Sequence, residues 1–71
     1  MCTSCDVESS PSKRYIGKMT LNRCKQSCRK EHKCIAIDYG KGIRNEQCYL
    51  NYGTKRTYNP NKDFDAHILQ G

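Results

Sequence analysis

Apolar and polar positions follow a helical spacing most clearly in residues 21–32. This stretch contains no Gly or Pro, and Thr20 before it is a residue type that commonly caps a helix N-terminus. Leu21, Cys24 and Cys28 lie at i, i+3 and i+7, so they share one narrow face of a helix. The pattern predicts a helix that buries its cysteines and exposes its charged residues.

Short runs of β-branched and aromatic residues predict strands on both sides of this helix. Residues 34–39 and 47–52 are two such runs, and the glycines between them favour a turn, so the pair reads as a β-hairpin. Tyr15-Ile16 is consistent with a short strand that ends at Gly17, and residues 64–69 with a last strand. Residues 1–12 and 53–62 are polar and rich in turn formers, so we expect a flexible N-terminal segment and an exposed, mobile loop.

The chain is too short and too polar for a core to stabilise it alone. Its 71 residues fit one domain spanning residues 1–71, only 35% of them are apolar, and Trp is absent. Six cysteines in so short a chain are typical of an oxidised, secreted scaffold. Residues 1–6 contain no apolar run, so we expect an extracellular protein whose leader peptide is not part of this chain, without a membrane span and monomeric.

The spacing of four cysteines narrows the fifteen possible pairings. Cys24 and Cys28 share the helix face, whereas Cys34 and Cys48 lie one on each strand of the hairpin. Pairing Cys28 with Cys34 and Cys24 with Cys48 would clamp the helix across the hairpin. Loop-closure entropy assigns such bonds about 2.4 and about 3.5 kcal/mol respectively.

The segments Tyr15-Ile16-Gly17, Thr20 to Cys28, Cys34 to Tyr39 and Cys48-Tyr49-Leu50 together resemble the PAN/apple family. They are similar to its aromatic-x-Gly lead, its helix with Cys-x3-Cys, its Cys-led strand and its closing Cys-x-Leu strand. The resemblance covers about residues 15–52. It implies an α+β fold, in which one helix packs on a curved antiparallel sheet, with the two disulfides named above. It also implies a non-catalytic module that binds proteins or carbohydrates.

Two positions depart from the family pattern. The apple-type disulfide that joins the ends of the domain is absent, because no cysteine follows Cys48. The chain instead carries Cys2 and Cys5, for which we favour a local disulfide over a bond to another chain. The family often places an acid at the third helical position, where this chain has Arg23.

The positive charge is concentrated in one part of the chain. Of thirteen basic and seven acidic residues, eight basic residues and one acid (Glu31) lie between Lys13 and Lys33. This window therefore has a charge of +7, and the rest of the chain has a charge of −1, which gives the net charge of +6. The predicted ligand-binding residues are these eight: Arg23, Arg29, Lys30 and Lys33 at the centre, with Lys13, Arg14, Lys18 and Lys25 around them. We expect this basic helix face to bind an acidic or sulfated glycan or an acidic protein surface.

Other functions compete with this one. A solvated charged surface is the plainest alternative, and a cationic effector peptide acting on a receptor or membrane is another. The helix uses its apolar face for cysteines, which argues against membrane activity. Nucleic acid is disfavoured because the scaffold is of an oxidised, extracellular type. Tyr15, Tyr49, Tyr52 and Tyr58 could stack on sugars, although we expect half of them to serve the core.

The sequence predicts no enzyme, no metal and no cofactor. Cys2-Thr3-Ser4-Cys5 has redox-motif spacing but precedes a polar loop rather than a helix. Cys24, Cys28, Cys34 and His32 lack the paired knuckle spacing of zinc sites. Asp63, Asp65 and His67 could hold a cation or act as an acid–base pair, but we expect a solvated face of an edge strand.

Overall fold

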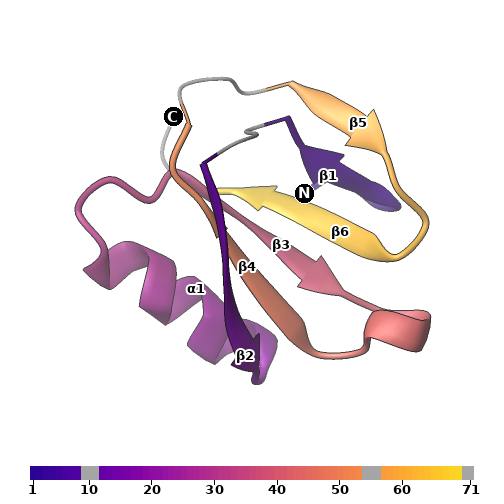
Figure 1. Ribbon diagram of the computed structural model, residues 1–71, viewed down its shortest axis with the longest axis horizontal. Helices are drawn as coiled ribbons and strands as arrows, with labels where there is room; N and C mark the ends of the chain where they lie inside the picture. The colour runs from indigo at the N-terminus through magenta and orange to yellow at the C-terminus, as the bar shows by residue number, and fades with distance from the viewer. Residues whose placement is uncertain (9–11, 54–56, 70–71) are drawn as a thin grey trace.

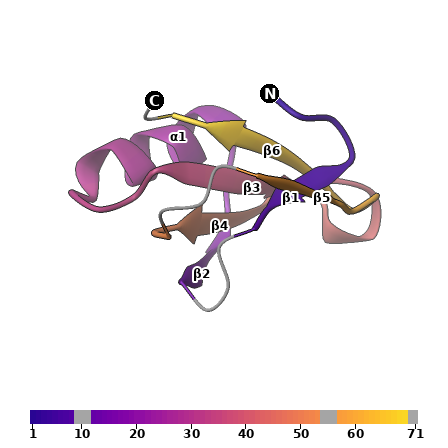
Figure 2. The same ribbon diagram turned by 90° about the horizontal axis from the view of Figure 1, so that it is seen from above.

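Four antiparallel strands form the main sheet, and one helix packs on one of its faces (Figure 1). The computed structural model describes residues 1–8, 12–53 and 57–69. The sheet order is β2 (Lys13–Lys18), β4 (Gln47–Asn51), β3 (Ala36–Gly40) and β6 (Phe64–Ile68). This order is visible from above in Figure 2. The predicted α+β class with one helix on an antiparallel sheet is confirmed.

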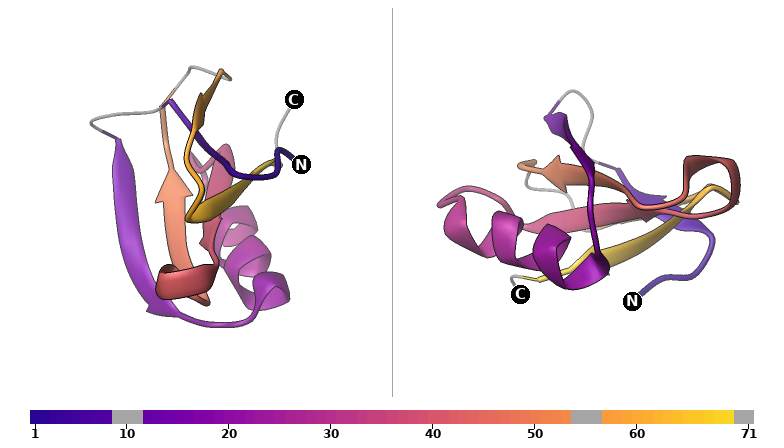
Figure 3. Two further views of the ribbon diagram at one scale, coloured as in Figure 1. Left: turned by 90° about the vertical axis from the view of Figure 1, so that its right-hand side faces the viewer. Right: turned by 90° about the horizontal axis from the view of Figure 1, so that it is seen from below.

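Helix α1 (Leu21–Lys30) begins where the sequence predicts. Thr20 is extended, and its hydroxyl accepts a hydrogen bond from the backbone N–H of Arg23 at 3.3 Å. The helix ends two residues earlier than predicted, because Glu31 takes an extended conformation and its N–H donates to the carbonyl of Cys28 at 3.0 Å. Figure 3 shows α1 beside β3 and β4, with β2 at the sheet edge farther from the helix.

The predicted hairpin is formed by β3 and β4, which pair in the register Asp38↔Tyr49. Their connection contains a short 3-10 helix, η1 (Gly42–Arg44). A Cβ atom at Gly40 would overlap the carbonyl oxygen of Arg44, so the close packing of η1 against the end of β3 requires glycine there. The observed strands start or end within two residues of the predicted ranges.

Strand β2 is longer than the two-residue strand that the sequence suggests. It pairs with β4 along Lys13–Lys18 and contains a bulge between Tyr15 and Gly17. Gly17 has a φ of +110°, a value that glycine adopts without strain. Gly17 therefore lies inside the strand, at the bulge, rather than at its end.

A second sheet of two strands corrects the prediction for the segments 1–12 and 53–62. β1 (Cys5–Val7) pairs with β5 (Tyr58–Pro60), and Cys2 bridges Ala66 of β6. Val7 is 1% exposed, so this part of the N-terminal segment is packed rather than flexible. In Figure 1, β1 and β5 lie together at the upper right, away from α1. Residues 9–11 and 54–56, which belong to the same predictions, lie outside the described residues.

The two faces of the main sheet have separate cores. Ile37 and Leu50 point toward α1 and contact the helix cysteines. Ala36 and Ala66 point to the opposite face, where they pack with Cys5 and Val7. Because successive strand residues alternate between faces, Asp38 lies on the β1 side, opposite to its neighbour Ile37.

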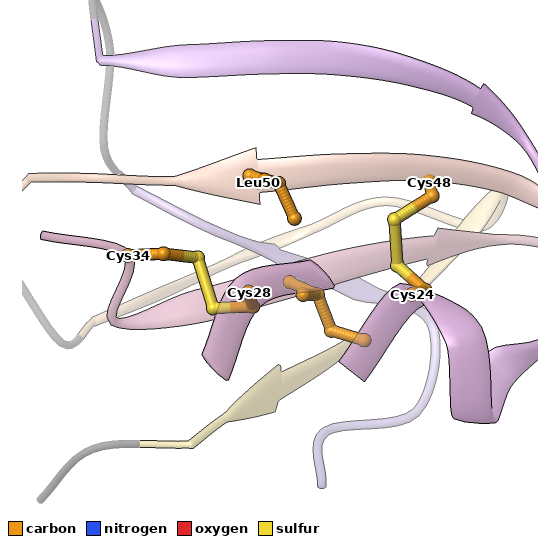
Figure 4. Close-up of a cluster of buried hydrophobic side chains, with 6 residues drawn as sticks. Cys24, Cys28, Cys34, Cys48 and Leu50 are labelled. Carbon is orange, nitrogen blue, oxygen red and sulfur yellow. A yellow bond between two sulfur atoms is a disulfide. The ribbon is translucent and has the colours of Figure 1, made fainter. Parts of the chain in front are cut away.

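All three expected disulfides are present. Cys24–Cys48 joins α1 to β4, and Cys28–Cys34 joins the last turn of α1 to the segment before β3. Figure 4 shows these two bonds with Leu50 between them. The third bond, Cys2–Cys5, closes the N-terminal segment on itself, so pairing of these residues with another chain is not what the structure shows.

Candidate functional site

Five basic residues surround the outer side of α1, and we call them the helix cations. They are Arg23, Lys25, Arg29, Lys30 and Lys33, of which Lys25 is half-buried and the others exposed. Lys33 was predicted to lie on the helix but follows its end at Lys30, in the turn before β3. Burial of Cys24 and Cys28 fixes the inner side of the helix and turns Arg23, Arg29 and Lys30 outward, with Lys25 at the border. Arg23 and Lys30 are seven residues apart on one flank, whereas Lys25 and Arg29 are four apart on the other. The helix therefore presents two rows of charge rather than the single row that the sequence suggested.

The helix cations have no internal counter-charges in the part of the chain that the structure describes. There, the ion pairs within 4.0 Å are made by Lys13, Arg14, Lys41 and Arg44, and none by the helix cations or by Lys18, which is exposed at the end of β2. The partners of these four residues are Asp38, Glu31, Asp65 and Asp63, respectively. The charge on the helix is left to solvent.

Two of the predicted site residues lie elsewhere. Lys13 points to the β1 side of the sheet, where its Nζ is 2.7 Å from Oδ2 of the buried Asp38 and 3.9 Å from Asp6. Arg14, one residue later in β2, points the other way and pairs with Glu31 at 3.5 Å. Lys13 therefore forms an ion pair on the β1 side of the sheet and is not part of the surface formed by the helix cations.

The helix itself accounts for some of these charges but not for all. Arg29 and Lys30 lie in the last turn, where positive charge interacts favourably with the helix dipole. Arg23 lies in the first turn, where a cation is unfavourable and where an acid would complete a capping box with Thr20. The stability of the helix therefore does not explain why an arginine occupies position 23.

The aromatic residues mostly serve the fold. The Tyr39 hydroxyl donates to the carbonyl of Met19 at 2.6 Å, and the Tyr52 hydroxyl donates to Glu31 at 3.1 Å. Burial raises the pKa of both phenols, and the bond to Glu31 raises the pKa of Tyr52 further. Tyr15 and Tyr49 pack ring to ring at 4.9 Å on the β1 side, and Tyr58 is exposed. None of the four predicted stacking tyrosines lies on α1.

A pocket of about 260 Å³ lies on the β1 side of the sheet, and we call it the sheet pocket. Its lining combines side chains from the sheet, from η1 and from the turn between β5 and β6: Lys13, Asp38, Arg44, Tyr49, Asn61, Asp63 and Phe64. This pocket was not predicted from the sequence. The available signal was Asp38, a carboxylate in an otherwise apolar strand, which indicates a buried polar group with a partner.

Asp63, Asp65 and His67 do not form an acid–base group. Asp63 pairs with Arg44 at 3.7 Å, and Asp65 accepts from Lys41 at 2.8 Å and from the N–H of Ser4 at 2.9 Å. These bonds lower the pKa of Asp65. His67 is buried rather than solvated, and its burial lowers its pKa, as do the charges of Lys25 and the N-terminus. Among the described residues, no three His, Cys, Asp or Glu side chains are placed to hold a metal ion.

Comparison with known proteins places the chain in a family. Searches of curated proteins and of solved structures gave no match. The profile of the PAN domain, in contrast, matches residues 5–69 and so includes α1, the strands β1 to β6 and five of the six cysteines. A match over nearly the whole chain, together with the helix clamped by Cys24–Cys48 and Cys28–Cys34, shows that this chain belongs to the PAN domain family.

Proposed function

We propose that this PAN domain binds an extracellular polyanion through the helix cations. PAN domains are non-catalytic modules that bind proteins or carbohydrates, and they occur in extracellular proteins. A sulfated or acidic glycan chain is the ligand class we favour, and an acidic protein surface is the other. Arg provides a bidentate fork for sulfate or carboxylate, and Lys provides a point charge.

The contrast between paired and unpaired cations carries this proposal. Lys13, Arg14, Lys41 and Arg44 each lie within 4.0 Å of a carboxylate, whereas the helix cations lack such a partner within the described ranges. Unpaired like charges repel one another and destabilise the helix by a few tenths of a kcal/mol per pair. A polyanion would replace this repulsion with attraction.

Arg23 adds an independent argument, since it occupies a position where its charge opposes the helix dipole and where an acid would cap the helix. A side chain that lowers stability without a structural partner is typical of a binding residue. Arg23 and Lys30 together define one flank of α1, about 10 Å apart along the axis at 1.5 Å per residue. Successive anionic groups of an extended chain can reach both.

Two disulfides hold the helix against the sheet, which favours binding. Cys24–Cys48 and Cys28–Cys34 fix the backbone of both helical turns that carry the cations. A preorganised backbone reduces the ordering entropy that opposes association. The same bonds bury the apolar side of α1, so this helix has no free apolar face to insert into a bilayer. Within the described ranges, no helix is long and apolar enough to span a membrane.

Reversal of two helix cations tests the proposal. We expect the double variant Arg29→Glu/Lys30→Glu to lower the affinity for a heparin-like sulfated oligosaccharide by about 30-fold or more. The reason is that two ionic contacts of about 1 kcal/mol each become repulsive. Affinity of the unchanged domain should also fall steeply as salt rises toward physiological strength, where screening sets in over roughly 8 Å. Isothermal titration calorimetry at two salt concentrations measures both effects.

Single reversals separate a local site from bulk charge. Lys62→Glu changes the net charge as much as Lys30→Glu does, but Lys62 is an exposed residue of the turn between β5 and β6. We expect Lys62→Glu to leave the affinity within about threefold of that of the unchanged domain. Equal losses in the two single variants would mean that the charge acts only in bulk. If only an acidic protein surface binds, the ligand class is corrected and the site stands.

A further inference from the structure

We infer that the sheet pocket is a second binding site, separate from the helix cations, and that it takes an uncharged polyhydroxylated ring such as a single hexose unit. The pocket of about 260 Å³ lies on the face of the sheet opposite to α1. Sites for drug-sized ligands begin at roughly 300 Å³, so this one suits a smaller molecule.

The charges of the pocket are balanced within the protein. Lys13 pairs with Asp38 at 2.7 Å, and Arg44 lies 3.7 Å from Asp63. Two cations and two carboxylates therefore line the pocket with no excess of either sign. An anion or a cation would have to separate one of these pairs, whereas a hydroxyl group can donate to a carboxylate and accept from Lys or Arg without doing so. This balance favours an uncharged ligand with many hydroxyl groups.

Hydrogen-bonding capacity remains at two sides of the pocket. Asp38 is 1% exposed, and its Oδ1 accepts the N–H of Val7 at 3.0 Å. Its Oδ2 makes the ion pair with Lys13 and is itself buried, so it is closed to a ligand. The Lys13 side chain is 29% exposed, and its ammonium has donors beyond the one directed at Asp38. Arg44 remains 44% exposed in its side chain, and its guanidinium has several donors beside the loose contact to Asp63.

Aromatic rings supply the apolar part of the lining. Tyr49 and Phe64 meet edge to face with ring centres 5.3 Å apart, and the guanidinium of Arg44 lies 5.8 Å from the centre of the Phe64 ring. Aromatic surface next to convergent polar groups fits a sugar ring, which has apolar C–H faces and a polar rim.

The turn that closes the pocket is held in place by its own bonds. The Asn61 amide donates to Asp6 at 3.0 Å, and its carbonyl oxygen accepts the N–H of Asp63 at 3.1 Å. The backbone carbonyl of Asp63 accepts from the N–H of Lys41 at 2.9 Å. Contacts with β1 and with the β3–β4 connection thus fix Asp63 before any ligand arrives, which lowers the entropy cost of binding.

A titration with neutral sugars tests this inference. The ¹⁵N-labelled protein would be titrated with the methyl glycosides of glucose, galactose, mannose and N-acetylglucosamine, up to about 50 mM, because a single sugar unit binds with a Kd of order 1 mM. We expect at least one of them to shift the amide signals of Tyr49, Phe64 and Asp63 and to leave those of α1 in place. No shift with any of the four would overturn the proposal, and so would equal shifts with the zwitterion glycine betaine.

Matched variants locate the binding. Asp63→Asn removes a charged acceptor at nearly unchanged volume, and Arg44→Gln removes a charged donor with a shorter side chain; each should lower the affinity for the sugar about tenfold. Lys62→Ala, at the exposed residue between Asn61 and Asp63, should leave the affinity unchanged. If the amide spectra show that both pocket variants are folded and both bind the sugar as tightly as the unchanged domain, the sugar does not bind in the sheet pocket. Arg29→Glu/Lys30→Glu should bind the sugar normally, so this result is independent of the helix cations.

Discussion

Replacing Cys24 and Cys48 together by alanine should lower the free energy of unfolding by about 3.5 kcal/mol, the largest loss among the three disulfides. The bond closes a loop with a sequence separation of 24, and its removal returns that loop-closure entropy to the unfolded chain. Both cysteines are fully buried between α1 and β4. A domain of this size is stable by roughly 4 to 10 kcal/mol, so the variant should be marginally folded at 37 °C.

The other two disulfides provide the matched comparison. The same change at Cys28 and Cys34, with a separation of 6, should cost about 2.4 kcal/mol, and at Cys2 and Cys5, with a separation of 3, about 1.8 kcal/mol. Urea denaturation of the three double-alanine variants measures the order. If the loss at Cys2 and Cys5 equalled or exceeded the loss at Cys24 and Cys48, the helix-to-sheet clamp would not be the main source of stability.

Lys13→Met should destabilise the domain by about 2 kcal/mol, because it leaves the carboxylate of Asp38 buried without its counter-charge. Loss of one partner of a fully buried ion pair costs about 3 to 5 kcal/mol, and we reduce this value because the Lys13 side chain is 29% exposed. Methionine keeps the aliphatic stem of the side chain, so little packing is lost. Thermal or urea unfolding at neutral pH measures the change.

A double-mutant cycle isolates this pair from other effects. Asp38→Asn removes the charge while keeping an oxygen that can accept from the N–H of Val7. Once asparagine stands at position 38, the further change Lys13→Met should cost little, which gives a coupling of about 1 to 2 kcal/mol. Simple additivity of the two losses would show that the 2.7 Å contact contributes no net stability.

The elements that the sequence predicted are those whose pattern is local. The helix follows from the spacing of Leu21, Cys24 and Cys28, and the hairpin from two β-branched runs separated by glycines. In contrast, β1 and β5 are only three residues long each, and their strand conformation depends on pairing between Cys5–Val7 and Tyr58–Pro60. Pairing between segments so far apart in the chain leaves no periodic signal in either of them.

The binding surfaces were also predictable to different degrees, because one depends on a local pattern and the other on residues that are far apart in the chain. Four of the helix cations lie on α1 and the fifth, Lys33, follows three residues after its end, so a local sequence pattern was enough to predict them. Charge counting nevertheless assigned Lys13 to that surface, because its partner Asp38 belongs to another strand and only the fold brings them to 2.7 Å. The sheet pocket combines residues of β2, β3, β4, η1, β6 and a turn, and a linear pattern cannot reveal such a combination.

The variant Arg23→Glu tests the central claim, binding through the helix cations, most directly, because stability and affinity should move in opposite directions. Glutamate at the third helical position completes a capping box with Thr20 and suits the helix dipole, so the free energy of unfolding should rise by about 0.5 to 1 kcal/mol. Its affinity for the sulfated oligosaccharide should fall about tenfold, since one ionic contact becomes repulsive. Calorimetric titration of this variant beside Lys62→Glu, with a urea unfolding curve for each, gives both quantities. A more stable variant that binds as tightly as the unchanged domain would contradict the account.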